Sequence, residues 1–504
     1  NNNNYTLAGV FKDGSTTSPE NINWVSGYNG NATPPISLAR YWLFKFQNGT
    51  EYADWMHFVE TDEMRPSQGF TLKGPDALTT TQNYTFVGKP YNGLIDGNSV
   101  LPDNLFLVGN PYPSAIDAFS FIKDNISVAN GGNNTVNVID GTLYFWHHSP
   151  TNNTHNLGEY TGGYATLNLA GGVDPIAPVV SAAPVAPVEI SGVGTSNKMP
   201  YQYIPVGQGF FVNGDVNSLT SAKIIFNNNQ RAFVKEDGVD DQSAPISNTL
   251  FRNSIKNNKS KPADHFADNS NDPVYNNYNT KIRLGFESAN NFHRQLLIGF
   301  MNENATDGVD IGYDGHQIDT QSNDLYFLIN NSEYTIQGVG EFDVNKAYPL
   351  GVKTGISGLV KFKIDGTEFL PSSQKIYVHD KETSIYHDIT HTAAEVSLEA
   401  GIYNSRFELT FKTTNSLGTR ENNLPESMLL VYNNDPEKTL KITKNQSFTI
   451  SEVSIYNING QRLVNLTKIP EHNTIEIPFN VQRGTYVVKI ITDKGVLSRK
   501  VLKQ

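Results

Sequence analysis

The chain of 504 residues contains no cysteine, and only 17% of its residues are charged. The lack of cysteine excludes a disulfide scaffold and thiol catalysis. No run approaches the roughly eighteen consecutive apolar residues that a membrane-spanning helix needs, so we expect no transmembrane segment. The net charge of −12 argues against nucleic acid as a partner. The chain begins at Asn1 without a charged and apolar leader, and we expect a mature or truncated product.

Helix signals are also scarce. One short helix is expected after Pro113, where Asp117 or Ser114 can cap it and Phe119 and Ile122 have helical spacing. Elsewhere short apolar runs, such as 41–46, alternate with turn residues. The sequence therefore predicts an all-β, multidomain fold, in which β-sandwich or jelly-roll-like domains precede a small Ig-like C-terminal β-sandwich.

Composition shifts along the chain predict its domains, because the chain is too long for a single core. We expect an aromatic- and glycine-rich β domain at 1–237, a polar linker or long loop at 238–272, a β-sandwich with an acidic loop at 273–412, a second linker at 413–423 and a C-terminal domain at 424–504.

Two short words recur in the first of these domains. VGKPY at 87–91 is repeated as VGNPY at 108–112, and SQGFTL at 67–72 is repeated as GQGFFV at 207–212. Two copies of two words predict an internal duplication within one β domain.

The last eighty residues contain the clearest pattern. Val453 and Ile455 alternate with polar residues, and Asn459-Gly460 is the dipeptide of a tight type I′ hairpin turn. Tyr486 begins a second alternating run, which Gly495 turns back into a final strand. Five or six short strands without a helix predict a small β-sandwich.

Three motifs of this stretch resemble a known family. IYNINGQRL, RGTYVVKI and the basic final strand resemble the type A C-terminal sorting domain of type IX secretion cargo, a system of the Bacteroidota. The resemblance implies the following sorting-signal residues: Asn459, Gly460, Gln461, Gly484, Tyr486, Lys489, Gly495, Arg499 and Lys500.

The same resemblance implies a route and partners. The chain is expected to pass through the periplasm and reach the cell surface or the medium. Its sorting domain is expected to dock on an outer-membrane shuttle barrel and on the translocon. From 481 to 504 the chain has six basic residues against one acidic residue, which suits an acidic partner surface, although a solvated edge strand also uses lysine. We expect a sharp turn at Gly484 and a last hairpin that gathers Lys489, Lys494, Arg499 and Lys500 on one side.

The part of the chain before the sorting domain is then the passenger. Words such as LVGNPYPSAIDA and GIYNSRFELTF resemble recurrent modules of surface cargo. We expect an adhesive or gliding-related passenger, and no catalytic motif predicts an enzyme. The alternative is a secreted glycan-binding protein or glycan-degrading enzyme. Its partner would be a surface polysaccharide, and its sugar-stacking residues, if they are not core, would be Trp24, Tyr28, Trp42, Trp55 and Trp146.

The acidic loop at 302–319 suggests a metal. Asp307, Asp310 and Asp314 lie close together in the chain among glycines, and Ca²⁺ prefers such oxygen ligands. The alternative is a turn-rich loop whose aspartates bond their own backbone.

Histidines suggest two further sites. His147, His148 and His155 have the side chains of a transition-metal set, although two of them end a strand. The pairs His379-Asp380 and His387-Asp388 suggest acid–base work, and cross-strand contacts are the alternative.

Overall fold

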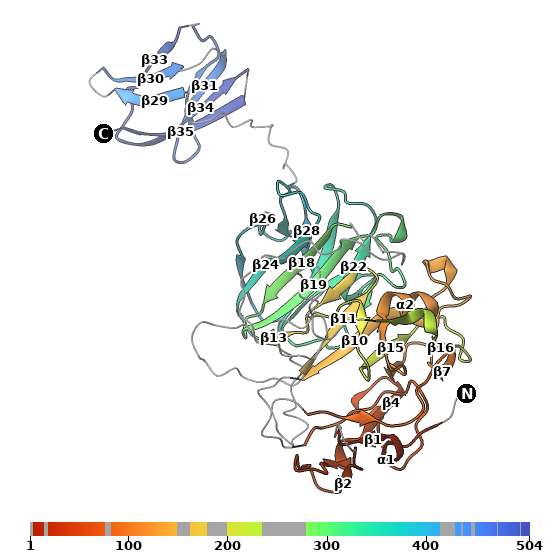
Figure 1. The fold of residues 1–504 in the computed structure, drawn as a ribbon. Coiled ribbons are helices and arrows are strands. Elements are labelled where there is room, and N and C mark those ends of the chain that lie inside the picture. Colours follow the sequence, from red (N-terminus) through yellow and green to blue (C-terminus); the bar gives the residue numbers. More distant parts are fainter. Residues whose placement is uncertain are drawn as a thin grey trace. The chain divides into compact units, whose positions relative to one another are not determined.

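The computed structural model describes residues 4–14, 19–75, 82–148, 162–178, 199–233, 279–413, 429–434, 437–444, 449–470, 472–493 and 495–503. The predicted linker 238–272 and nearly all of the linker 413–423 lie outside these ranges. The all-β prediction is confirmed, since strands dominate both compact units, 1–412 and 413–504 (Figure 1). The regions 1–237 and 273–412, which we predicted as separate domains, lie in the same unit.

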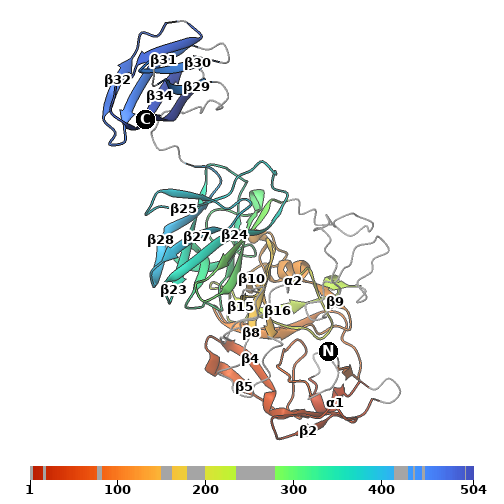
Figure 2. The same cartoon turned by 90° about the vertical axis from the view of Figure 1, so that its left-hand side faces the viewer.

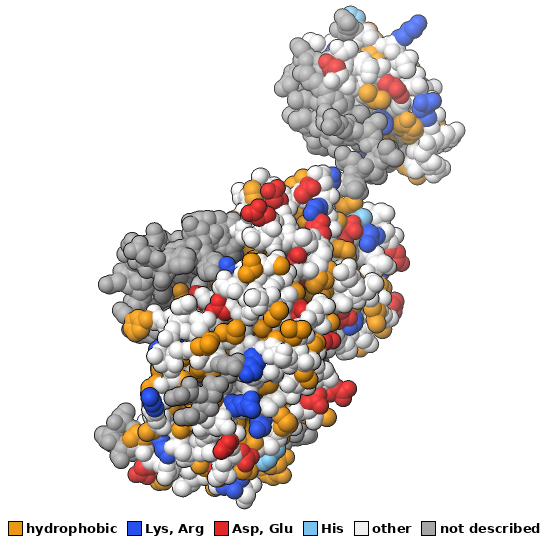
Figure 3. Space-filling view, turned by 90° about the vertical axis from the view of Figure 1, so that its right-hand side faces the viewer, with side chains coloured by type: hydrophobic (Ala, Val, Ile, Leu, Met, Phe, Trp, Pro, Cys, Tyr) orange, Lys and Arg blue, Asp and Glu red, His pale blue; other side chains and the backbone are white. Residues whose placement is uncertain are grey.

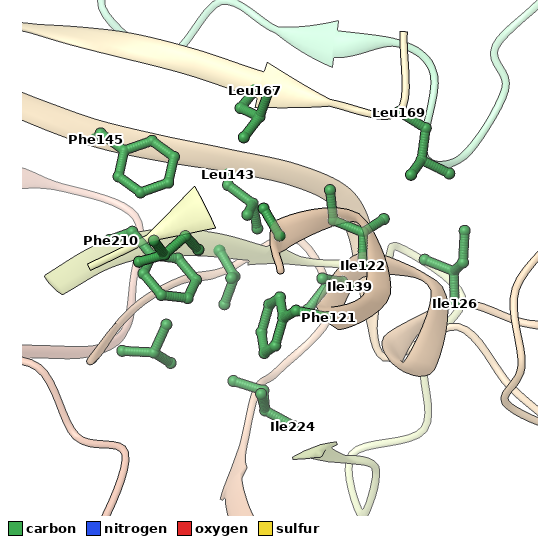
Figure 4. Packing of buried hydrophobic residues seen from close by; sticks show 14 of the residues in the cluster. Phe121, Ile122, Ile126, Ile139, Leu143, Phe145, Leu167, Leu169, Phe210 and Ile224 are labelled. Carbon is green, nitrogen blue, oxygen red and sulfur yellow. The ribbon is translucent and has the colours of Figure 1, made fainter. Parts of the chain in front are cut away.

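The predicted short helix is α2 (Ala118–Asn125). Its cap is Asp117, whose carboxylate accepts hydrogen bonds from the N–H groups of Phe119 at 2.9 Å and Ser120 at 3.0 Å. Phe121 and Ile122 are fully buried, and Figure 4 shows both side chains pointing into the core. The other described helices are α1 (Leu7–Val10) and the 3₁₀ turns Arg40–Trp42, Tyr52–Asp54, Val128–Asn130, Asn228–Gln230 and Asn302–Asn304.

An antiparallel sheet forms the middle of the first unit. In spatial order its strands are β12 (Gly171–Val173), β11 (Gly162–Asn168), β10 (Ile139–His148), β15 (Gly209–Gly214), β8 (Leu105–Gly109), β4 (Phe44–Gly49) and β5 (Trp55–His57). Leu143, Tyr144 and Phe145 of β10 are all fully buried, so both faces of this sheet are covered.

A larger sheet follows in the chain. In spatial order its strands are β26 (Ile385–Asp388), β25 (Tyr377–Asp380), β28 (Gly401–Thr410), β23 (Ala347–Thr354), β21 (Asp324–Ile329), β22 (Ser332–Val339), β19 (Phe292–Phe300), β18 (Lys281–Glu287), β24 (Gly358–Glu368) and β27 (Ala394–Leu398). β13 (Ala177–Pro178) pairs with β19, and β20 (Gly315–His316) pairs with β22. Only β19 and β22 run parallel in its described pairs.

Small sheets complete the first unit. They pair β1 (Phe11–Lys12) with β6 (Thr85–Phe86), β2 (Asn23–Val25) with β3 (Ser37–Ala39), β7 (Ile95–Ser99) with β16 (Lys223–Phe226), and β9 (Ala115–Asp117) with β14 (Tyr203–Ile204) and β17 (Arg231–Ala232). The run 41–46 was predicted as one buried strand. It is instead a 3₁₀ turn followed by β4, because the Leu43 N–H bonds back to the Arg40 carbonyl at 3.1 Å.

One hydrophobic core joins the two regions of this unit. Around Phe121, Leu143 and Phe210 it includes Leu297, Met301, Tyr313 and Ile336 from the second region (Figure 4 shows part of it). Backbone bonds cross the same junction: the Gly312 N–H donates to the Asp140 carbonyl at 2.8 Å, and the Leu169 N–H donates to the Gly312 carbonyl at 2.8 Å.

The repeated QGF motifs, at 68–70 and 208–210, follow matching turns on the two sides of β8. The Gln68 N–H donates to the Arg65 carbonyl, and the Gln208 N–H donates to the Pro205 carbonyl, which is the bond of a closed β-turn. Gln68 bridges to Val108 on one edge, and Gly209 pairs with Gly109 on the other. The repeat in sequence is therefore a repeat in structure at these turns.

The second unit has two sheets around one core. One contains β29 (Leu429–Asn434), β30 (Thr439–Lys444) and β33 (Thr474–Pro478). The other, in spatial order, contains β32 (Arg462–Leu466), β31 (Ile450–Asn457), β34 (Gly484–Thr492) and β35 (Gly495–Lys503). Leu440, Ile442, Val453 and Val488 are fully buried, which places the inward set of each strand in a shared core.

Candidate functional site

The Asn459-Gly460 turn differs from the predicted type I′ hairpin. Of the two residues only Gly460 has a positive φ, 77°. The Gly460 N–H donates to the Asn457 carbonyl, and the Asn457 side-chain oxygen accepts the N–H groups of Asn459 at 3.1 Å and Gln461 at 3.0 Å. The Asn457 side chain thus organises a longer loop that Gly460 closes, and the pairing of β31 with β32 shifts register between Ile455 and Tyr456.

The last hairpin forms as predicted. β34 and β35 pair without a register shift from Gly484 and Lys503 to Thr492 and Gly495. Gly484 is the first residue of β34 rather than a sharp turn. Lys494 lies outside the described residues, and the turn is tied to the rest of the sheet because Asp493 exchanges hydrogen bonds of 3.0 Å with Thr449.

Alternation along β35 separates the basic residues that were predicted to share one side. Arg499 lies opposite Val488, which is fully buried, so Arg499 is on the core side of this edge strand. Lys500 lies opposite the exposed Val487, and Lys489 lies opposite Ser498 on the same side. Opposed residues project to one face of a sheet, so the two lysines share a face and Arg499 does not.

We call this side the outer face and define it by Tyr456, Val487, Lys489, Lys500 and Leu502. Val487 is 39% exposed and Leu502 is 59% exposed. Its two lysines therefore lie among exposed apolar side chains.

Tyr486 has a structural position instead. Only 7% of it is exposed, its hydroxyl donates to the Gln482 carbonyl at 2.7 Å, and its ring packs edge-on against Phe479 at 5.2 Å between centroids.

The three aspartates of the acidic loop do not converge. Asp307 is exposed and pairs with Lys346 at 2.7 Å. Asp310 accepts from the N–H and the hydroxyl of Thr306 at 2.6 and 2.9 Å. Asp314 is buried and accepts the N–H groups of Asp310 at 2.6 Å and Gly338 at 2.8 Å. Each carboxylate thus has its own partners within the protein, and the calcium prediction rests on the sequence pattern alone.

The described residues include no group of three or more His, Asp or Glu side chains that would hold a metal. Of the predicted histidine set, His147 is buried on β10, and His155 lies outside the described ranges, as does the side chain of His148.

The two His-Asp pairs make cross-strand contacts. The His379 ring stacks on Tyr386 at 4.0 Å and lies 2.8 Å from Glu408. Asp380 pairs with Arg406 at 2.8 Å, and Asp388 pairs with Lys375 at 3.1 Å. The alternative interpretation of these pairs fits their geometry.

A carboxyl group with a shifted pKa lies near the junction of the two regions. Asp140 accepts the Thr142 N–H at 2.8 Å and the Asn213 amide at 3.2 Å. Burial raises the pKa of Asp140 to about 7, and the charges of Asp215 and Asp103 add to the rise. No sequence pattern pointed to Asp140, Asp103 and Asp215 as a set, because the three residues lie on separate segments of the chain.

Exposed tyrosines form a cluster near the chain start. Of the predicted aromatics Trp42 is buried and Tyr28 is 53% exposed. Tyr41 is 37% exposed and was missed because 41–46 was interpreted as a buried strand. Tyr52 is 68% exposed, and no sequence pattern pointed to it. The rings of Tyr28 and Tyr41 meet edge-to-face with centroids 4.6 Å apart.

Comparisons with known proteins match both units. Residues 20–411 match a family described as Domain of unknown function (DUF8693), and residues 430–504 match the Secretion system C-terminal sorting domain. No curated protein matches the chain. The second match confirms the resemblance to type IX cargo, and such cargo is secreted or attached to the cell surface. Among the described helices none is long and apolar enough to cross a membrane.

Proposed function

Since this chain belongs to the family described as Domain of unknown function (DUF8693) and ends in a secretion system C-terminal sorting domain, we propose that its first unit is an adhesive passenger displayed on the cell surface. The sorting-domain match supports the delivery. The exposed tyrosines of the first unit support adhesion, because aromatic side chains are enriched on the surfaces through which proteins bind partners. Gliding over a surface is one activity that such adhesion would serve.

Docking is proposed to use the outer face of the second unit. The partners are the outer-membrane shuttle barrel and the translocon. Exposed ion pairs give only about 0.2–1 kcal/mol each, so Lys489 and Lys500 alone cannot supply firm docking. Burial of Val487 and Leu502 beside them would add an apolar contribution.

A fusion experiment tests delivery. A fluorescent protein with a signal peptide is joined to residues 424–504 and expressed in a type IX-competent cell. We expect fluorescence at the cell surface or in the medium. A matched fusion that lacks 496–504 loses β35, with the buried Leu497 and Val501, and should stay in the periplasm. Periplasmic retention of the complete fusion would refute delivery by this unit.

Adhesion is tested separately. A strain without the chain is compared with a complemented strain for attachment to polysaccharide-coated surfaces and for colony spreading. The proposal expects attachment to fall without the chain and to return on complementation. Equal attachment by both strains would argue against an adhesive passenger, whatever the result of the export experiment.

A glycan-degrading enzyme is the second candidate, and the Asp140 group favours it. Glycosidases use two carboxyl groups whose pKa values differ, and burial raises the pKa of Asp140, with smaller contributions from the charges of Asp215 and Asp103. Reducing ends released from a polysaccharide by the full chain, and lost in Asp140→Asn, would support this candidate. No release from any polysaccharide tested would leave adhesion as the sole proposal.

A further inference from the structure

Two of the exposed tyrosines follow the ends of paired parallel strands. Trp24 of β2 pairs with Leu38 of β3, and the two strands run in the same direction. Tyr28 comes shortly after β2, and Tyr41 comes shortly after β3. The carboxyl ends of parallel strands meet at one edge, which brings the two rings together. Figures 1 and 2 both place β2 at the end of the first unit where β4 also lies.

Hydrogen bonds from side chains to backbone carbonyls fix the loops that carry these two rings. The Trp42 indole N–H donates to the Tyr28 carbonyl at 2.8 Å, so the loop after β2 is fixed to the residue next to Tyr41. Arg40 donates to the Trp24 carbonyl at 2.9 Å and pairs with Glu60 at 2.8 Å. The cluster is thus ordered before any ligand arrives, which lowers the entropic cost of binding.

The third tyrosine extends the cluster beyond a single ring pair. Tyr52 lies on the turn Tyr52–Asp54, where Asp54 accepts the N–H groups of Thr50 at 2.7 Å and Glu51 at 2.9 Å. The turn leads into β5, whose His57 ring nitrogen lies 3.1 Å from the carbonyl of Arg40, the residue before Tyr41. Partial burial raises the pKa of Tyr52, and the charge of Tyr41 adds to the rise. Tyr41 therefore contacts Tyr28 directly, and Tyr52 lies on the turn between the two strands that follow Tyr41 in the chain.

The chemistry of this surface is aromatic and neutral. Each tyrosine offers a flat apolar ring and a hydroxyl that both donates and accepts hydrogen bonds. Three nearby charged side chains already have partners within the protein. Arg40 pairs with Glu60, Asp54 caps its turn, and the Lys73 amine lies 4.8 Å from the centre of the Trp42 ring. Figure 3 shows one face of the molecule, on which acidic and basic side chains are scattered among hydrophobic and uncharged ones.

We propose that Tyr28, Tyr41 and Tyr52 form a platform that binds a neutral polysaccharide. A sugar ring has apolar C–H faces that match an aromatic ring, and hydroxyls at its edges that match the tyrosine hydroxyls. Several rings in succession suit a chain of sugars rather than one. This site deepens the proposed adhesive function and rests on it.

Affinity electrophoresis of the full chain tests the platform. Native gels contain a neutral β-glucan, a mannan or a galactan. We expect at least one to retard the chain, and Tyr41→Ala to bind about tenfold more weakly, which corresponds to about 1.4 kcal/mol. The double variant Tyr28→Ala/Tyr41→Ala should migrate as in a gel without polysaccharide.

Matched variants separate the platform from general effects. Tyr201, 40% exposed and outside the cluster, provides the control Tyr201→Ala, which should be retarded like the natural chain. Tyr52→Ala removes the most exposed ring of the three and gives a second test if the double variant melts early. Tyr41→Phe keeps the ring, and it should retain most of the binding if stacking dominates.

Three outcomes would overturn the platform. They are no retardation in any of the three gels, equal retardation of the natural chain and the tyrosine variants, and retardation only by an anionic polysaccharide such as alginate. Cells that attach normally with Tyr28→Ala/Tyr41→Ala, but not without the chain, would reject this site and leave the adhesive function intact.

Discussion

Ser67 and Gly207 occupy the same position in two matching turns, with φ of 69° and 71°. Each lies directly before the glutamine of a QGF word, and each turn flanks β8. A positive φ suits glycine and strains a residue with a Cβ. The first turn therefore has a strain that the second avoids.

This difference predicts opposite effects of two substitutions. Ser67→Gly should raise the free energy of unfolding of the first unit, and Gly207→Ser should lower it, each by about 1 kcal/mol. Thermal and urea unfolding of both variants would measure the two changes. Gly366→Ala is the control, since Gly366 has no positive φ and a Cβ there would meet no atom within 4 Å. Changes of the same sign at 67 and 207 would contradict the equivalence of the turns.

Asp314 predicts a pH dependence of stability. Burial raises its pKa to about 8, well above the ordinary aspartate value of about 4, although two backbone N–H groups oppose the rise. The folded state therefore keeps a proton that the unfolded state loses, and this contribution is complete below about pH 4 and is lost as the pH rises through 8. Asp314→Asn stays neutral throughout.

We thus expect the melting temperature of the natural chain to fall between pH 5 and pH 9, and that of Asp314→Asn to fall less steeply. The melting temperature of Asp314→Asn should still fall somewhat with pH, because the pKa of Asp140 is also raised, to about 7. Calorimetry across this range would measure both slopes. Parallel curves would show that Asp314 does not hold the proton.

Calcium binding by Asp307, Asp310 and Asp314 stays a prediction. An ion bound only by the folded state would make millimolar Ca²⁺ raise the melting temperature of the first unit, and Asp310→Ala should abolish the rise. Thr306→Val is the matched control, because it removes the hydroxyl bond to Asp310 and keeps the carboxylate. If Ca²⁺ leaves the melting temperature of the natural chain unchanged, the turn interpretation stands.

The outer face predicts which charges affect export. Lys489→Glu/Lys500→Glu should lower the fraction of full-length chain at the surface while the melting temperature of the second unit changes little. Lys438→Glu/Lys468→Glu is the control, because it reverses two charges outside the outer face. Fractionation of cells followed by immunoblotting would measure export. Equal losses in the two double variants would indicate a response to net charge rather than to this face.

Local patterns in the sequence were sufficient for part of this structure. Asp117 and the apolar spacing after it predicted α2, and the alternation around Tyr486 predicted β34, because both signals lie within a few residues. The Asn459-Gly460 turn was wrong in type, since the side chain of Asn457 sets its geometry. Sequence spacing alone gave no sign of that contact.

Contacts between distant segments escaped prediction. Asp314 was predicted as a metal ligand because of its neighbours in sequence, but one of its partners is Gly338 on β22. Lys500 and Arg499 were assigned to one basic side, although adjacent strand residues point to opposite faces. Tyr41 became visible as a surface residue only after the turn at Arg40–Trp42 was known.

The shared core of the first unit also constrains the order in which the chain matures. Ile122 and Leu143 belong to a buried cluster that extends to Ile336, so a nascent chain that ends earlier cannot complete this core. During vectorial synthesis and translocation, the apolar side of α2 stays exposed until about two hundred further residues have emerged. Exposed apolar surface of this kind promotes aggregation. A periplasmic holdase that covers this surface until β22 has emerged would prevent that aggregation.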